Sequence, residues 1–160
     1  MIMSLASVRT FLAAQAPDIQ ILEIPDSTAT VAQAAAAFGV EPGQIAKTLA
    51  FRVGEQTLIL VARGDARLDN RKIRTRFGGK PRMLPLEDVE PVTGHPIGGV
   101  CPFGLSQSLP VYCDRSLLGF AEVLPAAGSP NSAVRIAPER LAILTNAEWV
   151  DVCAETPNVD

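Results

Sequence analysis

The sequence has few of the residues that build metal centres and disulfide frameworks. Its 160 residues include three cysteines and a single histidine, and the cysteines, at positions 101, 113 and 153, form no C-x-x-C pair. A structural zinc site draws on several such ligands at short spacings, and a disulfide framework needs regularly spaced, paired cysteines. We therefore expect no disulfide framework, no bound metal and no cofactor.

Long apolar runs are also missing. No apolar segment approaches the roughly 18 to 20 residues that span a bilayer. The first residues, Met1 to Ala6, lack the basic segment and long apolar stretch of a secretory leader. The expectation is a soluble, cytoplasmic protein without a membrane partner. Apolar residues make up 48% and charged residues 19% of the chain, which is typical of a globular protein, and we expect one domain over residues 1–160.

Basic charge is scarce overall but concentrated in one stretch. The net charge is −3, yet residues 52–82 hold nine basic and three acidic residues, a local +6 against −9 elsewhere. Such a stretch is either an ordinary solvated helix face or a surface that grips a polyanion through its phosphates. The basic residues that we assign to phosphate contacts are Arg63, Arg67, Arg71, Lys72 and Arg74.

Hydrophobic periodicity and turn residues predict a mixed α/β fold. The β-rich runs 47–53 and 57–63 flank a Gly54-Glu-Gln turn and predict a hairpin. Its second strand is apolar on both faces, which indicates a central position in the sheet. Helices are expected at 5–16, 30–38, 70–77, 85–90 and 138–144, and further strands at 19–24, 110–114, 119–124 and 133–137. This order favours a mixed sheet with helices packed around it.

Lys47 is the first candidate for a functional side chain. Alternation along a strand puts Lys47 on the same face as Leu49 and Phe51. An ammonium group on an apolar face is costly unless it meets an anion, a carbonyl or an open cavity. The alternative is that Lys47, at the end of the strand, extends into water. The pattern leaves both interpretations open.

The second candidate is the loop Gly98-Gly-Val-Cys-Pro102. Adjacent glycines let backbone N–H groups approach an oxyanion, a sugar hydroxyl or a phosphate, although a tight turn without a ligand shows the same composition. The spacing fits neither a Walker A loop nor a dinucleotide fingerprint. His95 and Cys101 could form a thiol–imidazole dyad, but no third group that would orient the histidine is evident. We interpret Cys101 as a small loop side chain and His95 as a turn residue.

Taken together, these motifs resemble the YbaK/ProX family, the free-standing relatives of the editing domain inserted in bacterial prolyl-tRNA synthetases. The resemblance covers about residues 20–155 and rests on the segments Gln44–Leu49, Leu68–Lys72, Thr93–Gly104, Ala127–Asn131 and Ile136–Leu141. It implies a mixed α/β fold with a strongly curved, barrel-like sheet surrounded by helices. The implied activity is the removal of wrongly attached amino acids from tRNA.

The resemblance also implies roles for particular residues. In that family the lysine that matches Lys47 is critical, and the loop that matches residues 98–102 holds the 3′-terminal adenosine and the aminoacyl ester. We accordingly assign catalytic roles to Lys47 and to the amides of Gly99, Val100 and Cys101, and substrate binding to Gly98 and Pro102.

A turn further along the chain bears on the amino acid that is removed. Relatives that remove cysteine carry Ser-Ala-Gly and, a few residues later, an aspartate, whereas this chain has Ala126-Ala-Gly128 and Ala133. The difference counts against cysteine and leaves Gly128, Ser129 and Asn131 as the groups expected to face the amino acid. The sequence does not choose among alanine, 2-aminobutyrate and serine or threonine, and alanine is the first hypothesis because editing removes amino acids smaller than the cognate one.

The implied enzyme is a trans-editing hydrolase that deacylates proline tRNA carrying a small amino acid such as alanine. Its expected partners are the acceptor end of a mischarged tRNA, held by the basic residues above, and an aminoacyl-tRNA synthetase. One alternative is a non-catalytic module of the same fold that binds tRNA or a synthetase. Another is a thiol hydrolase that uses Cys101.

Overall fold

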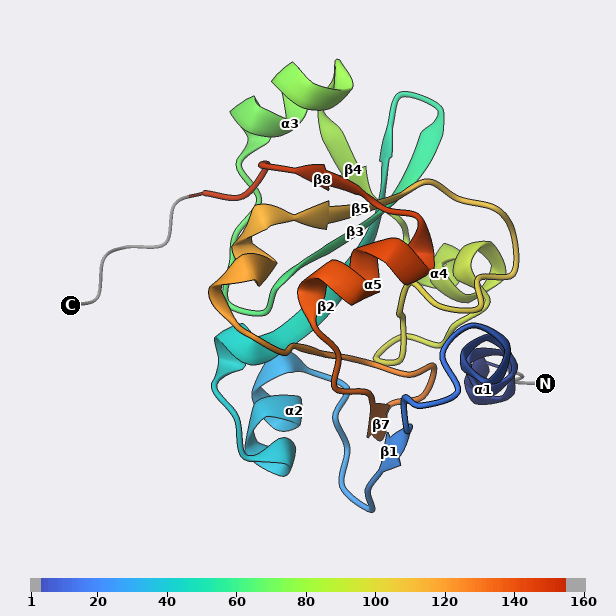
Figure 1. Cartoon of the computed structure of the whole chain (residues 1–160). Helices are drawn as coiled ribbons and strands as arrows, with labels where there is room; N and C mark the ends of the chain where they lie inside the picture. The colour runs from blue at the N-terminus through green and yellow to red at the C-terminus, as the bar shows by residue number, and fades with distance from the viewer. Residues whose placement is uncertain (1–3, 155–160) are drawn as a thin grey trace.

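The computed structural model describes residues 4–154 and shows a mixed sheet surrounded by helices (Figure 1). Residues 1–3 and 155–160 lie outside the described residues. The first range belongs to the segment that was compared with a secretory leader, and the second is the end of the expected domain. The helices are α1 (Ser4–Gln15), α2 (Val31–Phe38), α3 (Asn70–Phe77), α4 (Leu86–Thr93) and α5 (Pro138–Thr145), with two 3₁₀ helices at Pro42–Gln44 and Arg115–Gly119. None of the helices within residues 4–154 is long and apolar enough to cross a bilayer.

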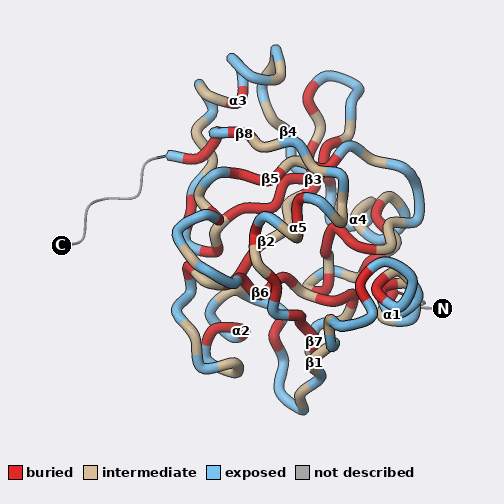
Figure 2. The backbone as a smooth tube through the Cα atoms, in the orientation of Figure 1, coloured by how far each residue is buried: buried red, intermediate tan, exposed pale blue. Residues whose placement is uncertain are grey.

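The predicted hairpin forms the centre of the sheet. Strands β2 (Ile45–Val53) and β3 (Gln56–Arg63) pair antiparallel, and β4 (Pro81–Met83) pairs antiparallel with β2. On the other side, β5 (Val111–Asp114) runs parallel to β3, and β8 (Glu148–Val150) runs parallel to β5. A short β6 (Leu124–Pro125) also pairs with β2, while β1 (Leu22–Glu23) and β7 (Ser132–Ala133) form a separate pair. Figure 2 shows the central strands largely buried, as predicted for the second strand of the hairpin.

Local signals account for the helix that was predicted at 70–77. The Asp69 carboxylate accepts hydrogen bonds from the N–H groups of Arg71 and Lys72, at 2.9 and 3.1 Å, and so caps the first turn. Gly78 ends the helix in the left-handed conformation, with φ +83°, which glycine adopts without a steric penalty. These two residues set the bounds of α3 independently of its packing.

Two predictions about strands need correction. The mixed α/β fold is confirmed, but within residues 4–154 the sheet is open, with the order β4-β2-β3-β5-β8. It is therefore not closed into a barrel, and the barrel-like curvature is not confirmed. The strand predicted at 119–124 is also wrong in most of its length. A 3₁₀ helix, capped where Asp114 accepts from Ser116 N at 2.9 Å, extends to Gly119. Val123 forms only an isolated bridge to Ile136, and of the predicted residues only Leu124 belongs to a strand.

One edge of β2 is covered only at its two ends. β6 pairs with Ile45 and Ala46, β4 pairs with residues 51–53, and no strand in the described part of the chain covers this edge between them. The Ala50 C=O faces this edge, because it accepts a hydrogen bond from Leu84 N at 3.3 Å. Peptide groups two residues apart in a strand face the same side. The N–H and C=O of Thr48 therefore face the uncovered gap.

Candidate functional site

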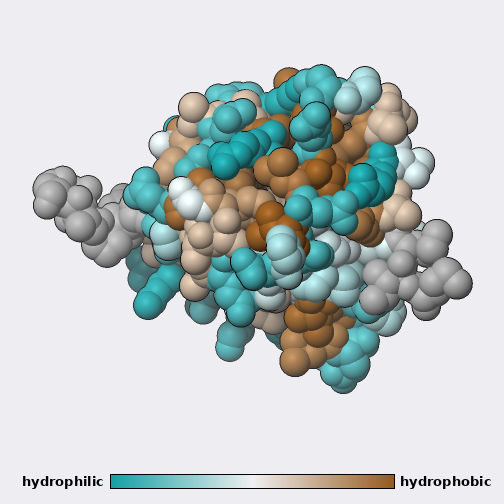
Figure 3. Space-filling view, turned by 90° about the horizontal axis from the view of Figure 1, so that it is seen from below, coloured by the Kyte–Doolittle hydropathy of each residue, from teal (hydrophilic) through white to brown (hydrophobic). Residues whose placement is uncertain are grey.

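A cavity of about 320 Å³ lies at this gap in the sheet. Its wall comes from the segment before α2, from α2 itself, from β2, and from the loops around Leu84, Gly98 and Ser132. Most lining residues are alanine, valine, leucine or isoleucine. Figure 3 views the molecule from the end that carries α2 and β7, where hydrophobic residues reach the surface among hydrophilic ones. The cavity thus combines an apolar wall with an unpaired strand edge.

Lys47 contributes to this wall and is half-buried. As predicted, it shares a strand face with Leu49 and Phe51, and Phe51 lies in the core. The Lys47 ammonium donates a hydrogen bond to the Ala66 carbonyl. Burial lowers the pKa of Lys47 below its ordinary value, and the nearby Cys153 and Asp65 partly oppose this shift. The lysine is therefore held between the protein interior and the cavity by one neutral acceptor.

The predicted glycine loop borders the same cavity. Gly98 and Val100 are in the wall together with Lys47. Gly98 has φ +88°, and a Cβ built there would lie 2.8 Å from the Cβ of Ala29. A Cβ on Gly99 would lie 2.7 Å from Ser129 N. Any side chain at these two positions would push the loop away from its neighbours, so the close approach requires glycine.

Not every amide of the loop is available to a ligand. The Gly99 N–H donates to the Pro96 carbonyl at 2.9 Å and so closes a tight turn. Within residues 4–154 no hydrogen bond is formed by the amides of Val100 and Cys101. Cys101 is fully buried and does not line the cavity, and the Gly98 amide likewise forms no hydrogen bond within these residues. Gly98 and Val100 therefore offer the unpaired amides in the cavity wall, whereas Gly99 serves the shape of the loop.

The Cys101 thiol belongs to the core. Its side chain is fully buried, with Sγ 3.6 Å from His95 Nε2 and 3.6 Å from the Phe103 carbonyl. Burial raises the pKa of this thiol to about 12, so it is protonated at neutral pH and is a poor nucleophile. Pro102 is buried beside it, and neither residue is among those that line the cavity.

His95 connects the loop to helix α1. Its Nε2 lies 2.7 Å from the Phe103 carbonyl and donates to it, so Nδ1 is the acceptor for the Ser4 hydroxyl of α1. The ring is fully buried, and this burial lowers the pKa of His95. The residue interpreted as a turn residue is thus a buried link between α1 and the segment that follows the glycine loop.

The polar groups of the 128–131 turn are occupied within the turn. Ser129 Oγ donates to Asn131 Oδ1 at 2.9 Å and lies 2.6 Å from Ser132 Oγ. Asn131 Nδ2 donates to the Ile24 carbonyl at 3.0 Å. The turn lies against the glycine loop at Gly128 and Ser129, but the cavity wall here consists of Ser132 and neighbouring alanines. Ser129 and Asn131 therefore hold the turn in shape.

Two threonines that the sequence did not single out also line the cavity. The hydroxyls of Thr28 and Thr48 are buried and have no hydrogen-bond partner in the described part of the chain. Thr48 directly follows Lys47, and its peptide groups face the gap in the sheet. Nothing local in the sequence identifies either residue, because the gap depends on which distant segments pair with β2.

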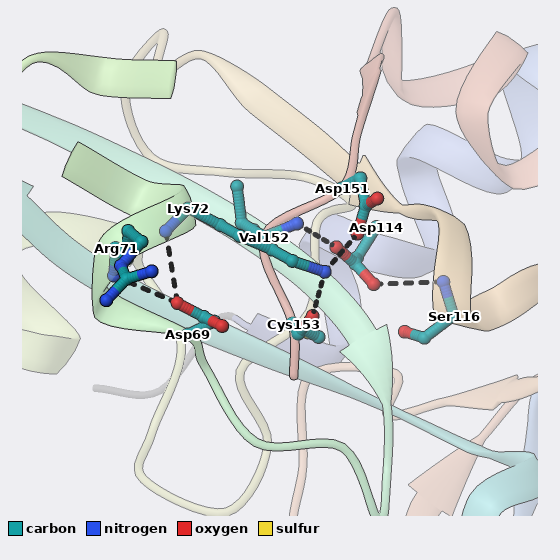
Figure 4. A network of polar contacts seen from close by, with 8 residues as sticks. All are labelled: Asp69, Arg71, Lys72, Asp114, Ser116, Asp151, Val152 and Cys153. Atoms are coloured by element: carbon teal, nitrogen blue, oxygen red, sulfur yellow. Dashed lines mark hydrogen bonds and ion pairs between the residues drawn. The ribbon is translucent and has the colours of Figure 1, made fainter. Parts of the chain in front are cut away.

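The basic residues divide into an open set and an engaged set. Arg67, Arg71 and Arg74 are exposed. Lys72 instead donates to Asp151 at 3.1 Å and to the Cys153 carbonyl at 2.9 Å, which ties α3 to the C-terminal segment (Figure 4).

Arg63 is engaged as well. It pairs with both carboxylate oxygens of Asp65, at 2.6 and 3.1 Å, and its guanidinium lies 5.0 Å from the centre of the Phe120 ring. In Figure 1, α3 and α2 are at opposite ends of the molecule, so the basic helix and the α2 side of the cavity are well separated. Among residues 4–154 no group of three or more histidine, cysteine, aspartate or glutamate side chains is placed to hold a metal ion.

Comparisons with known proteins place this chain in a family. Residues 25–144 match the family described as the aminoacyl-tRNA editing domain, and the chain belongs to that family. It is 47% identical over 155 residues to the uncharacterized protein YwhH of Bacillus subtilis, covering 96% of this chain and 99% of that protein. The resemblance to the YbaK/ProX editing family is thereby confirmed.

Two further relatives carry names that refer to editing. EbsC of Enterococcus faecalis, named as a Cys-tRNA(Pro)/Cys-tRNA(Cys) deacylase, is 32% identical over 121 residues, which cover 74% of this chain and 73% of EbsC. A crystal structure described as a trans-editing enzyme for prolyl tRNA synthetase superposes with a TM-score of 0.87 at 37% identity, covering 95% of this chain and 98% of that one.

Proposed function

We propose that this protein is a trans-acting aminoacyl-tRNA deacylase that hydrolyses the ester between a small amino acid and the 3′-terminal adenosine of a mischarged tRNA. The observation that carries the proposal is the shared cavity. Lys47 and the Gly98 loop, far apart in the sequence, line one apolar cavity at an unpaired strand edge in a chain of the editing family. That arrangement fits an ester that is bound and polarised inside a partly dry pocket.

The chemistry needs no protein nucleophile. An aminoacyl ester is already activated, so hydrolysis requires a positioned water and stabilisation of the tetrahedral oxyanion. In this proposal the Lys47 ammonium and the amides of Gly98 and Val100 provide that stabilisation. The Thr48 C=O, at the free edge of β2, is an acceptor for the α-ammonium group of the aminoacyl ester. A ribose hydroxyl of the substrate aligns or activates the water, which accounts for a site without an evident general base.

The proposed substrate is proline tRNA that carries a small amino acid, with alanine as the reference case. Synthetase pockets reject smaller amino acids weakly, and a second, smaller site then destroys the error. Alanines at positions 126 and 133 border the cavity at the turn that was predicted to face the amino acid. The relative EbsC is named for cysteine, and cysteine therefore belongs in every substrate panel.

Contacts to the tRNA are assigned to the exposed arginines Arg67, Arg71 and Arg74. Arg63 and Lys72 are less suited, because each already holds a carboxylate. We propose that the acceptor end of the tRNA enters the cavity and that a synthetase partner reads the more distant tRNA features. The crystal structure of the trans-editing relative, whose description names prolyl-tRNA synthetase, supports that partnership.

A panel of charged tRNAs tests the proposal. Proline tRNA charged with alanine, serine or cysteine is incubated with the wild-type protein and with Lys47→Ala, and ester loss is measured against the rate without protein. Removal of one stabilising group from such a site typically lowers the rate about 10²- to 10³-fold. We expect a loss of that size for Lys47→Ala with an unchanged melting temperature.

The exposed Lys80 provides the matched control. Lys80→Ala also removes one lysine, and it should hydrolyse the esters at the wild-type rate. Near wild-type hydrolysis by Lys47→Ala would overturn the catalytic assignment. Binding of charged tRNA without any ester loss would instead support the non-catalytic module.

A further inference from the structure

Five polar side chains line the cavity, and three of them are satisfied by contacts within the protein. The five are Thr28, Thr30, Lys47, Thr48 and Ser132. The Thr30 hydroxyl caps α2 by accepting from Gln33 N at 3.1 Å. Lys47 donates to the Ala66 carbonyl, and Ser132 Oγ lies 2.6 Å from Ser129 Oγ. The Lys47 ammonium keeps two further N–H donors, and besides it a ligand in the cavity finds two hydroxyls without a partner in the described wall.

Those two side chains are Thr28 and Thr48. Each hydroxyl is buried and has no hydrogen-bond partner within residues 4–154, and Thr28 is only 6% exposed. A buried hydroxyl without a partner destabilises the folded protein, and valine would fill the same space without that penalty. Two such hydroxyls in the wall of one cavity fit a ligand that brings its own hydrogen-bonding group.

Thr28 lies where the two predicted substrate-binding segments meet. Its N–H donates to the Pro130 carbonyl at 2.5 Å, which joins it to the 128–131 turn. The next residue, Ala29, lies against Gly98 of the glycine loop. Thr48 follows Lys47, where the ester is placed. Strand alternation puts the Thr48 side chain on the face of β2 opposite to Lys47. An aminoacyl group whose side chain enters the cavity would nevertheless meet both threonines, because Thr28 and Thr48 line the same wall.

We propose that Thr28, together with Thr48, is a specificity-determining residue that selects amino acids with a side-chain hydroxyl, so that serine esters are removed faster than alanine esters. The inference rests on the proposed function and refines its substrate. A hydroxyl both donates and accepts, so a serine side chain can pair with the threonine hydroxyls. An alanine side chain would leave both threonine hydroxyls unpaired. Binding sites reject a substrate analogue that lacks the matching polar group, because their own buried polar groups are then left without a partner.

The test compares serine, alanine and cysteine esters of proline tRNA with the full-length wild-type protein, Thr28→Val and Thr48→Val. For the wild type we expect kcat/KM for the serine ester to exceed that for the alanine ester by roughly tenfold or more. A ratio of that size corresponds to about one additional hydrogen bond to the substrate. Thr28→Val should bring this ratio close to one. Its melting temperature should stay the same or rise, because valine matches the shape of threonine and removes an unpaired hydroxyl.

Thr30→Val is the matched control, since Thr30 lines the same cavity with a hydroxyl that is already engaged. It should lower the melting temperature through the lost helix cap and leave the serine-to-alanine ratio as in the wild type. The inference is overturned by equal wild-type rates for serine and alanine, by a preference for cysteine over serine, or by an unchanged ratio in both Thr28→Val and Thr48→Val.

A binding measurement separates this inference from the proposed function. If no ester is hydrolysed, the proposed function fails, but selectivity is still readable with 3′-amino-3′-deoxyadenosine linked to serine or alanine through a stable amide. Calorimetry should show roughly tenfold tighter binding of the seryl compound to the wild type and equal binding of both to Thr28→Val. Equal binding of both to the wild type would overturn the inference.

Discussion

At the scale of single residues, position in the fold decides which reactive group can act. Lys47 and Cys101 were both catalytic candidates, and both lie beside the same loop. Lys47 is among the residues that line the cavity, and its ammonium donates one hydrogen bond, to the neutral Ala66 carbonyl, which leaves two N–H donors for another acceptor. Cys101 is enclosed in the core and does not line the cavity, so neither its thiol nor its amide is placed for substrate contact.

This enclosure makes Cys101 unreactive. Its thiol has a pKa raised to about 12 by burial, so thiolate is rare at pH 8 and alkylation by iodoacetamide requires local opening. We expect Cys101→Ser to deacylate within about threefold of the wild type, because the buried thiol takes no part in the reaction. Peptide mass spectrometry after brief alkylation should show position 101 unmodified. Rapid modification with parallel loss of deacylation would revive the thiol hydrolase.

At the scale of secondary structure, α1 and the glycine loop are joined through one buried imidazole. His95 Nδ1 accepts a hydrogen bond from the Ser4 hydroxyl of α1, and His95 Nε2 donates one to the Phe103 carbonyl. A Cβ on Gly128 would lie 2.7 Å from the Ser4 hydroxyl, so the same end of α1 also touches the second predicted substrate-binding segment. Docking of α1 therefore fixes both segments that border the cavity.

Acid should weaken this junction. Burial lowers the pKa of His95 below its ordinary value of 6.5, so the unfolded chain takes up a proton near pH 6.5 while the folded protein does not. Stability is then unaffected by this group above pH 6.5 and falls as the pH drops below it, by at most about 1.4 kcal/mol per pH unit.

Melting curves between pH 7.5 and 5 provide the measurement for the junction. His95→Gln keeps a donor and an acceptor without a titratable group, so it should lose less stability over this range than the wild type. Equal losses in the two proteins would show that His95 does not control the acid sensitivity.

At the scale of the whole molecule, charge and cavity are separated. The exposed arginines of α3 stand at the end of the molecule away from α2, which borders the cavity (Figure 1). An RNA that places its terminus in the cavity and its backbone on α3 must therefore extend along the protein. This arrangement suits a short protein with a net charge of −3, because attraction is confined to one region.

Salt should weaken tRNA binding through these arginines. Each phosphate contact contributes about −0.7 to −0.9 to the slope of log K against log salt. Arg71→Ala with Arg74→Ala should therefore reduce the steepness of the slope by roughly 1.5, measured by filter binding of uncharged proline tRNA. Arg140 is the control, because it lies on α5 rather than α3 and pairs with Asp18 at 2.6 Å. Arg140→Ala should keep the wild-type slope. An unchanged slope in the double variant would contradict the assignment.

The sequence by itself determined the local features of this protein. The cap at Asp69, the stop at Gly78, the hairpin turn after Val53 and the face on which Lys47 lies all follow from residues within a few positions of one another. Local backbone preferences and strand alternation are enough to set such features. The strand expected at 119–124 was wrong, because a 3₁₀ helix extends to Gly119 and a strand begins only at Leu124.

Only the tertiary structure decided what surrounds those features. The gap in the sheet exists because Ile45 pairs with Leu124 and Val53 pairs with Pro81, contacts between segments far apart in the chain. Within residues 4–154 that gap leaves the edge of β2 at Thr48 without a pairing strand, and the Thr28 hydroxyl has no hydrogen-bond partner. A long-range hydrogen bond also ties Asn131 to the Ile24 carbonyl, and burial encloses Cys101. Hydrogen-bond satisfaction depends on three-dimensional neighbours, so no local pattern could have assigned these roles.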